Sequence, residues 1–320
     1  MPGRQAAWAG DQTMCGIAGY MDKSSTQAPA GAVLLHMLEA LGQRGPDSAG
    51  LALFGAGTPS REICWVKLPE NIDHETAVGR ALDLIGRVAR IRGHRQVEGL
   101  IRVEIERTST AAEFCATVEV PASHLEIISL GNRLELVKQV GAPANLGRLL
   151  DINGFRGSHG IGHTRLSTES RVDLSHSQPF WARGVPDLAT VHNGHITNYH
   201  RLRRTYEQQG VHFFTENDSE VIGVYLADQL ARGRSLEEAM AASLKDLDGS
   251  FTYLVATPDF FGYARDPFAL KPLLIVETGS YVALANEEVA IRHALGNAGT
   301  AHEPSGNVYR LWRRPAAVAA

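Results

Sequence analysis

Short apolar segments separated by turns fill the second half of the chain, and this feature constrains the fold most. Each segment has the length and composition of a β-strand, and three longer segments with helical spacing lie among them. The strands are expected within residues 160–168, 188–196, 250–259, 262–267, 271–277 and 281–287, and the helices within 198–209, 217–232 and 235–247. Many short strands with a few helix pairs predict an α+β fold, in which helices stack on antiparallel sheets.

The first half of the chain begins in the same way. Residues 15–20 (CGIAGY) are apolar with two glycines, which predicts a strand buried on both faces. A helix at 32–45 and a strand at 48–55 follow. We therefore expect one domain over residues 15–310. Residues 1–14 are expected to be a disordered extension, a propeptide or the result of a start codon assigned too early, and residues 311–320 a C-terminal tail.

Residues 57–150 differ in character from the segments on either side. They contain several strand-like runs, including residues 115–120 (CATVEV), and a helical pattern over residues 74–91. The basic run from Arg87 to Arg95 is expected at the exposed end of that helix. We interpret this stretch as an inserted α+β unit.

The overall composition excludes several classes of protein. The 320 residues carry a formal net charge of −4, which gives no electrostatic reason to expect nucleic acid or an anionic membrane as partner. No apolar run approaches the roughly 20 residues of a membrane-spanning helix. Three cysteines are too few and too scattered for a disulfide framework, a zinc site or an iron–sulfur cluster. We expect a cytoplasmic protein without a metal or cofactor of its own.

Cys15 is the candidate nucleophile. A thiol with an ordinary pKa near 8.5 is only slightly ionised at neutral pH, so it needs an adjacent base. If the chain began at Cys15, the α-amine of that residue could serve as the base, since its pKa of roughly 7.7–8.0 suits proton transfer near neutrality. The two glycines that follow would let a substrate approach the backbone closely. The alternative is a buried structural cysteine in a core strand.

Three further segments carry polar groups suited to one kind of ligand. Arg165 ends a strand, and its guanidinium can hold a carboxylate through two hydrogen bonds. Asn193 and Gly194 could form a two-donor oxyanion hole, although Asn-Gly is also a common hairpin turn. Asp218 stands at a helix start, where it either caps the helix or binds an ammonium group. Together with a nucleophile, these groups fit an amino acid with a terminal amide.

Six motifs in order give the chain its family resemblance: MCGI (14–17), RGPDSAG (44–50), GHTRLST (162–168), HNG (192–194), NDSE (217–220) and RDPFALKPL (265–273). With these motifs the chain resembles the class II glutamine amidotransferases, a group of N-terminal nucleophile (Ntn) enzymes.

That resemblance implies a four-layer αββα sandwich and assigns roles to matching positions. Cys15 resembles the nucleophile, and Asn193 with Gly194 the oxyanion donors. Arg165 resembles the clamp for the α-carboxylate of L-glutamine, and Asp218 the partner of its α-amine. The pocket-lining positions are Leu166, Thr168 and His195.

A narrower resemblance concerns the free-standing form of the chain and its mid-domain insertion. In both respects it is similar to the glutamate-synthase-like amidotransferase subunit of N-methylglutamate synthase. This likeness implies that separate synthase subunits, one carrying FMN and an iron–sulfur cluster, use the ammonia. One departure is that thirteen residues precede Met14, whereas family members begin at the cysteine after processing. While these residues are attached, the nitrogen of Cys15 is an amide and cannot act as a base.

Three other functions stay open on the sequence alone. The first is an Ntn-type cysteine hydrolase of a different, more apolar amide, which would not need the pair Arg165 and Asp218. The second is a thiol activated by His163 or His192. The third is a regulatory or scaffold subunit that binds glutamine without turning it over.

Overall fold

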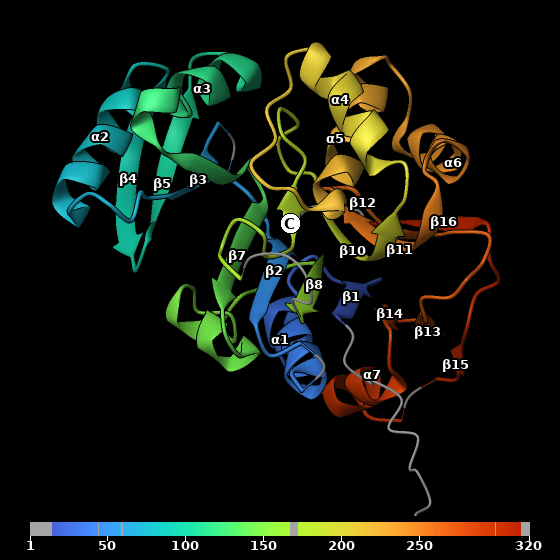
Figure 1. The fold of residues 1–320 in the computed structure, drawn as a ribbon. Coiled ribbons are helices and arrows are strands. Elements are labelled where there is room, and N and C mark those ends of the chain that lie inside the picture. The colour runs from blue at the N-terminus through green and yellow to red at the C-terminus, as the bar shows by residue number, and fades with distance from the viewer. Residues whose placement is uncertain (1–14, 44, 59, 167–171, 298, 315–320) are drawn as a thin grey trace, which may run out of the picture.

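The computed structural model describes residues 15–43, 45–58, 60–166, 172–297 and 299–314. Its centre consists of two antiparallel sheets packed face to face (Figure 1). From edge to edge, the seven-stranded sheet contains β15 (Ala301–His302), β13 (Leu274–Glu277), β14 (Tyr281–Ala285), β1 (Gly16–Asp22), β8 (His159–Arg165), β2 (Ser48–Phe54) and β7 (Leu134–Val140). The five-stranded sheet contains β16 (Val308–Arg313), β12 (Phe260–Arg265), β11 (Gly249–Ala256), β10 (Ala189–Ile196) and β9 (Phe180–Trp181).

Helices cover the outer face of each sheet. α1 (Ala30–Leu41) and α7 (Glu288–Leu295) pack against each other on the seven-stranded sheet, and α4 (Tyr199–Gln208), α5 (Asp218–Ala231) and α6 (Leu236–Asp246) lie on the side of the five-stranded sheet. This four-layer αββα arrangement confirms the predicted fold class. None of the described helices is long and apolar enough to span a membrane.

Close packing explains the two glycines that follow Cys15. A Cβ atom at Gly16 would lie 2.6 Å from Oγ1 of Thr164 on the neighbouring strand. A Cβ atom at Gly19 would lie 2.7 Å from the ring of Phe261, which belongs to the opposite sheet. The expectation that these glycines admit a substrate is therefore wrong: each makes room for a neighbouring side chain, and Gly19 lets the two sheets approach each other.

A third sheet stands apart from the sandwich (Figure 1). It contains β4 (Ala89–Val97), β5 (Leu100–Arg107), β3 (Glu62–Lys67) and β6 (Glu126–Gly131), and it is accompanied by α2 (His74–Gly86) and α3 (Ala111–Val118). We call this unit the insert. It is an α+β unit, but it is shorter than the expected 57–150, because β7 returns to the seven-stranded sheet and pairs with β2.

Three local expectations differ from the structure. Residues 115–120 do not form a strand; α3 occupies most of them, because Thr110 and Glu113 form a reciprocal capping box that starts a helix. The basic run from Arg87 to Arg95 lies largely in strand β4 rather than at a helix end. β16 pairs with β12 through Arg313, so a tail that begins at residue 311 would divide a strand.

One buried carboxylate joins the insert to the sandwich. The turn between β6 and β7 directs three backbone N–H groups at Asp187: Oδ2 accepts from Asn132 at 2.9 Å, and Oδ1 accepts from Arg133 and Leu134 at 2.8 Å each. Asp187 is 8% exposed and precedes β10 closely. The exit of the chain from the insert is thereby held against the five-stranded sheet.

Candidate active site

A cavity of about 830 Å³ opens where β1 begins, β8 ends and α5 starts. We call it the cysteine cavity. Its lining includes seven of the eight site residues expected from the sequence, namely Cys15, Arg165, Leu166, Asn193, Gly194, His195 and Asp218. The eighth, Thr168, lies outside the described residues. Segments more than 200 residues apart in the sequence therefore meet at one place, with dimensions typical of a small-molecule site.

Cys15 lies immediately before β1, and its thiol donates a hydrogen bond to the backbone oxygen of Leu166, with Sγ at 3.6 Å. Burial raises the pKa of the Cys15 thiol, while the positive charges of Arg165 and Lys271 act in the opposite direction. The thiol is therefore not ionised by its surroundings alone, and it needs a base to become a nucleophile.

Asn193 on β10 lies beside the nucleophile. Its Nδ2 donates to the backbone oxygen of Cys15 at 2.9 Å, and its Oδ1 lies 3.2 Å from Nε2 of His163. Burial lowers the pKa of His163 to about 3, so that imidazole is neutral and its Nε2 carries the proton donated to Asn193. The amide is thus fixed in orientation, and the second hydrogen of Nδ2 is available for an oxyanion.

Gly194 follows Asn193 in a backbone conformation that only glycine adopts easily. Its φ is +132°, and a Cβ atom there would lie 2.1 Å from the backbone oxygen of Ser250 on β11. The neighbouring position, His195, is exposed at the edge of the cavity. The Asn-Gly pair therefore lies within β10, which pairs with β11 without a register shift, and the simple hairpin turn is excluded because β10 continues to Ile196.

Arg165 and Asp218 supply opposite charges to the same cavity. Arg165 is 4% exposed at the end of β8, and burial lowers the pKa of its guanidinium, with Cys15, Asp173 and Asp47 acting in the opposite direction. Asp218 is the first residue of α5, but the side chain that caps this helix belongs to Asn217. Oδ2 of Asp218 instead accepts from the backbone N–H of Ile196 at 2.7 Å.

The two histidines considered as bases are bonded elsewhere. Nδ1 of His192 lies 2.8 Å from Oγ of Ser219, and the backbone N–H and C=O of His192 bond to the side-chain amide of Gln178. Burial lowers the pKa of both His163 and His192. In the described structure, the thiol of Cys15 bonds to a backbone oxygen and to neither imidazole. A Cys-His pair is therefore not the arrangement found here.

Sequence reasoning missed two residues of the cysteine cavity. Lys271 lines the cavity, and its positive charge acts to lower the pKa of Cys15. It belongs to the matched motif RDPFALKPL, so its charge within a motif could have identified it as a site residue. Asn286, 3% exposed after β14, also lines the cavity, and it was regarded only as the end of a strand. Its Oδ1 accepts from the backbone N–H of Ile17 at 3.0 Å, whereas its Nδ2 is buried without a hydrogen-bond partner among the described residues.

A family model and two sequence relatives of this chain all carry the description glutamine amidotransferase. A family model described as a glutamine amidotransferase domain matches residues 163–293. A putative glutamine amidotransferase of Methanothermobacter thermautotrophicus is 36% identical over 288 residues, which cover 88% of this chain and 94% of that protein. The glutamine amidotransferase-like protein GlxB of Rhizobium meliloti is 36% identical over 279 residues, which cover 87% of this chain and 91% of that protein.

Solved structures agree on the fold. The glutamine phosphoribosylpyrophosphate amidotransferase of B. subtilis superposes with a TM-score of 0.57 at 19% identity, covering 93% of this chain. This chain spans only 49% of that structure, so the likeness concerns the fold of one part of it.

The four-layer fold is the one seen in the solved amidotransferase, and the cavity places a cysteine directly before a central strand. The chain belongs to the glutamine amidotransferase family, and it is an enzyme with class II glutamine amidotransferase activity.

Proposed function

We propose that the chain hydrolyses L-glutamine to glutamate and ammonia through a thioester on Cys15, and that it passes the ammonia to a partner synthase subunit. The main support is the convergence in one cavity of a thiol, an Asn-Gly pair, a buried cation and a carboxylate. Glutamine presents one complementary group to each of these. The cavity of about 830 Å³ is large enough to hold glutamine.

Each residue has a distinct role in this proposal. The guanidinium of Arg165 binds the α-carboxylate, and Oδ1 of Asp218 binds the α-ammonium group, since Oδ2 is already bonded to Ile196. Sγ of Cys15 attacks the side-chain carbonyl carbon, and the oxygen that becomes negative receives hydrogen bonds from Asn193 and Gly194. Collapse of this intermediate breaks the carbon–nitrogen bond and releases ammonia, and water then hydrolyses the thioester to glutamate.

The base in this scheme is the α-amine of Cys15, freed by removal of residues 1–14. It accepts the thiol proton and returns it to the departing ammonia. Two observations favour this base: the thiol bonds to a backbone oxygen, and the two nearby histidines are neutral and bonded to other groups.

We further propose that the acceptor reaction is N-methylglutamate or glutamate synthesis, carried out by glutamate-synthase-like subunits and a subunit with FMN and an iron–sulfur cluster. The support is the motif resemblance together with the insert. Among the described residues, no group of three or more histidine, cysteine, aspartate or glutamate side chains is placed to hold a metal ion. In this proposal the FMN and the iron–sulfur cluster belong to the partner subunits.

The hydrolysis is tested by comparing the full chain with a chain that begins at Cys15, using glutamine and butanamide. Butanamide keeps the amide and the carbon chain of glutamine but lacks the α-carboxylate and the α-amine. We expect glutamine hydrolysis only when the mass of the protein corresponds to Cys15 as first residue, and no hydrolysis of butanamide. Equal turnover by a chain that retains Met14 would contradict the amine mechanism, and equal use of butanamide would favour the more general amide hydrolase.

A non-catalytic, glutamine-binding subunit is distinguished by covalent labelling. Diazo-oxo-norleucine, an electrophile that mimics glutamine, should label Cys15 in the processed chain and not in its Cys15→Ala variant. Labelling confined to Cys64 or Cys115 would contradict the catalytic assignment. The synthase reaction is tested on the complex purified from its native source, with glutamine and methylammonium. The methylammonium nitrogen should replace the α-amino nitrogen of the glutamate formed, giving N-methylglutamate and ammonium; ammonia without N-methylglutamate would exclude this reaction.

A further inference from the structure

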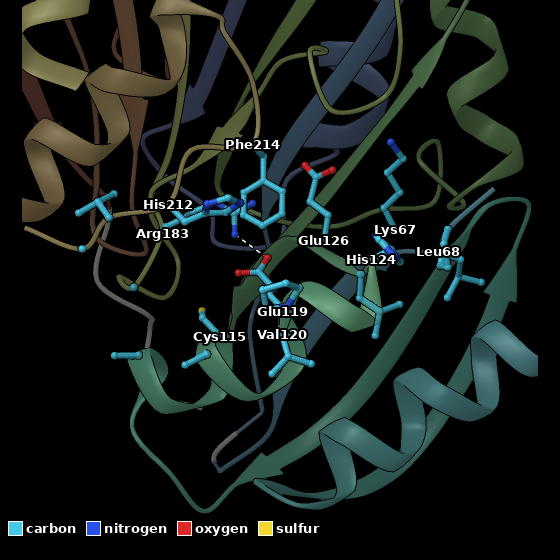
Figure 2. A pocket seen from close by; sticks show the side chains of 18 of the residues that line it. Lys67, Leu68, Cys115, Glu119, Val120, His124, Glu126, Arg183, His212 and Phe214 are labelled. Atoms are coloured by element: carbon cyan, nitrogen blue, oxygen red, sulfur yellow. Dashed lines mark hydrogen bonds and ion pairs between the residues drawn. The ribbon is translucent and has the colours of Figure 1, made fainter. Parts of the chain in front are cut away.

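A second cavity, of about 930 Å³, lies between the insert and the loop that precedes α5 (Figure 2). One side consists of the chain after β3, from Lys67 to Asn71, together with α3 and the residues that lead into β6. The other side consists of Asp173, Arg183 and residues 210–214. It shares none of the described lining residues of the cysteine cavity, so it is a separate site. We call it the Glu119 cavity.

Two buried carboxylates in this cavity each have one oxygen bonded and one available. Oε1 of Glu119 accepts from Nη1 of Arg183 at 2.6 Å, drawn as a dashed line in Figure 2, and from the backbone N–H of Ile127 at 2.7 Å. Oε2 of Glu126 accepts from Oγ of Ser175 at 2.5 Å. The side chain of Glu119 is 10% exposed, and Glu126 is 9% exposed. Within the described part of the chain, no group donates to the second oxygen of either residue.

Those second oxygens are not sealed inside the protein. Neither is among the described side-chain atoms that are fully buried without a partner, so each has some contact with solvent, and both residues line the Glu119 cavity. Burial raises the pKa of Glu119, Arg183 opposes this effect, and the negative charge of Glu126 adds to it. The negative charge of Glu126 thus opposes that of Glu119, and a cation bound in the cavity would reduce this effect and donate to an available oxygen.

The charges of the whole lining also favour a cation. Four acidic residues line the cavity, namely Glu70, Glu119, Glu126 and Asp173, against one lysine and one arginine, Lys67 and Arg183, and two histidines, His124 and His212. The lysine and the arginine are engaged already: Arg183 bonds to Glu119 and stacks 3.7 Å from the centre of the Phe214 ring, and Lys67 donates to Ser175 at 2.9 Å. An anion would therefore meet net repulsion here.

The rest of the lining indicates what kind of cation fits. No set of three metal-ligating side chains is present among the described residues, which argues against a metal ion. Apolar side chains form much of the wall: Leu68, Pro69, Ala112, Ala116, Val120, Leu125, Val211 and Phe214. A space of about 930 Å³ with such walls suits a small molecule with an apolar body.

We propose that the Glu119 cavity binds an organic ammonium compound, with its charged nitrogen at the available oxygens of Glu119 and Glu126 and its apolar body against α3. The inference does not depend on the proposed function, because the cavity and its charges lie outside the cysteine cavity.

The test uses two probes of similar shape and opposite charge, 2-phenylethylammonium and 3-phenylpropionate, with binding to the full chain measured by titration calorimetry. We expect saturable binding of the ammonium probe at millimolar concentration or below, and none of the carboxylate probe. Glu126→Gln should lower the affinity for the ammonium probe about 10- to 100-fold, since a hydrogen bond to a charged group is lost. The matched control is Glu75→Gln on the exposed surface of α2, which should bind as the unmodified chain does.

A second variant fills the cavity without changing its charge. Ala116 lies on the exposed side of α3 and lines the cavity, so Ala116→Trp should fold normally and abolish binding of the ammonium probe. Glutamine hydrolysis by the processed protein should stay unchanged in all three variants, which shows that each is folded. Equal affinity for the two probes, no binding of the ammonium probe, or undiminished binding by both Glu126→Gln and Ala116→Trp would overturn the proposal.

Discussion

Asn286 and Ile17 bond to each other twice. Oδ1 of Asn286 accepts from the backbone N–H of Ile17 at 3.0 Å, and the backbone N–H of Asn286 donates to the oxygen of Ile17 at 3.3 Å. Ile17 lies two residues after the candidate nucleophile, so this pair fixes the start of β1 against the end of β14. Because the contact acts through the backbone, we regard Asn286 as a positioning residue for Cys15.

Replacing Asn286 should therefore slow turnover more than it weakens substrate binding. In Asn286→Ala the buried N–H of Ile17 loses its acceptor, which we expect to cost about 1–3 kcal/mol of stability. A shift of the nucleophile should lower kcat by about 10- to 100-fold with little change in KM. Steady-state kinetics and urea unfolding measure both effects, with exposed Asn297→Ala as control. A change confined to KM would contradict the positioning role.

Asn193 should stabilise the transition state of glutamine hydrolysis. Its Nδ2 is fixed by the oxygen of Cys15, which prepares the second hydrogen for the oxyanion without further ordering. Asn193→Ala should lower kcat on the order of 10²- to 10³-fold while glutamine still binds. The exposed residue Asn153 provides the control Asn153→Ala, for which wild-type rates are expected. Wild-type kcat in Asn193→Ala would exclude its part in the oxyanion hole.

Gly194 and Gly210 form a matched pair of glycines with positive φ. The φ of Gly194 is +132° and a Cβ atom would lie 2.1 Å from the oxygen of Ser250, whereas Gly210 has a φ of +87° and open space around it. Gly210→Ala should cost only the backbone strain, about 1–2 kcal/mol. Gly194→Ala should in addition displace β10 from β11 and abolish glutamine hydrolysis. Similar effects of both substitutions, in unfolding and in activity, would show that strand spacing at Gly194 is unimportant.

His159 should make the stability of the fold depend on pH. It is buried, stacks 4.7 Å from the Phe54 ring, and burial lowers its pKa from 6.5 to about 4. Between these two values the unfolded chain binds more protons than the folded chain, so stability rises with pH across this window and is lost as the pH falls from 6.5 toward 4. The full effect is on the order of 3 kcal/mol.

The pH effect is measured by urea unfolding at pH 7 and pH 5 for the natural protein and for His159→Gln. The natural protein should lose more stability between these two pH values than the variant does. An identical pH dependence in both proteins would mean that His159 does not contribute. His163, with its pKa lowered to about 3, adds to the acid sensitivity of both proteins and cancels in the comparison.

The strands and helices of the sandwich could be predicted from local signals, whereas its four-layer arrangement was implied by the family resemblance. The segment that became β10, for example, is bounded by turn residues and pairs along its whole length with β11. The insert was less predictable because its short elements are ambiguous: α3 contains alternating apolar residues that suggest a strand, and its capping box at Thr110 decides the matter. The destination of β7 could not be predicted, since strand pairing depends on contacts far apart in the sequence.

Motif residues in the site could be located in advance, whereas those that act through tertiary contacts could not. Asn286 is an ordinary asparagine in the sequence, and its importance depends on Ile17, 269 residues away. Similarly, Glu119 and Glu126 are two unremarked acids until α3 and β6 bring them to one cavity. Local patterns reveal which groups are reactive, while the partners that orient them are set by the folded chain.

The three amide groups held by Asp187 have a mechanical consequence. A carboxylate that engages three successive residues of a turn resists both tilting and twisting of the chain that passes through it, so the insert cannot pivot freely about the sandwich. A protein that bound the far side of the insert would therefore be held at a constant distance and angle from Cys15. Loss of Asp187 would loosen this connection without freeing the insert, because Glu135 on β7 also bonds to Trp65 and Arg102 of the insert.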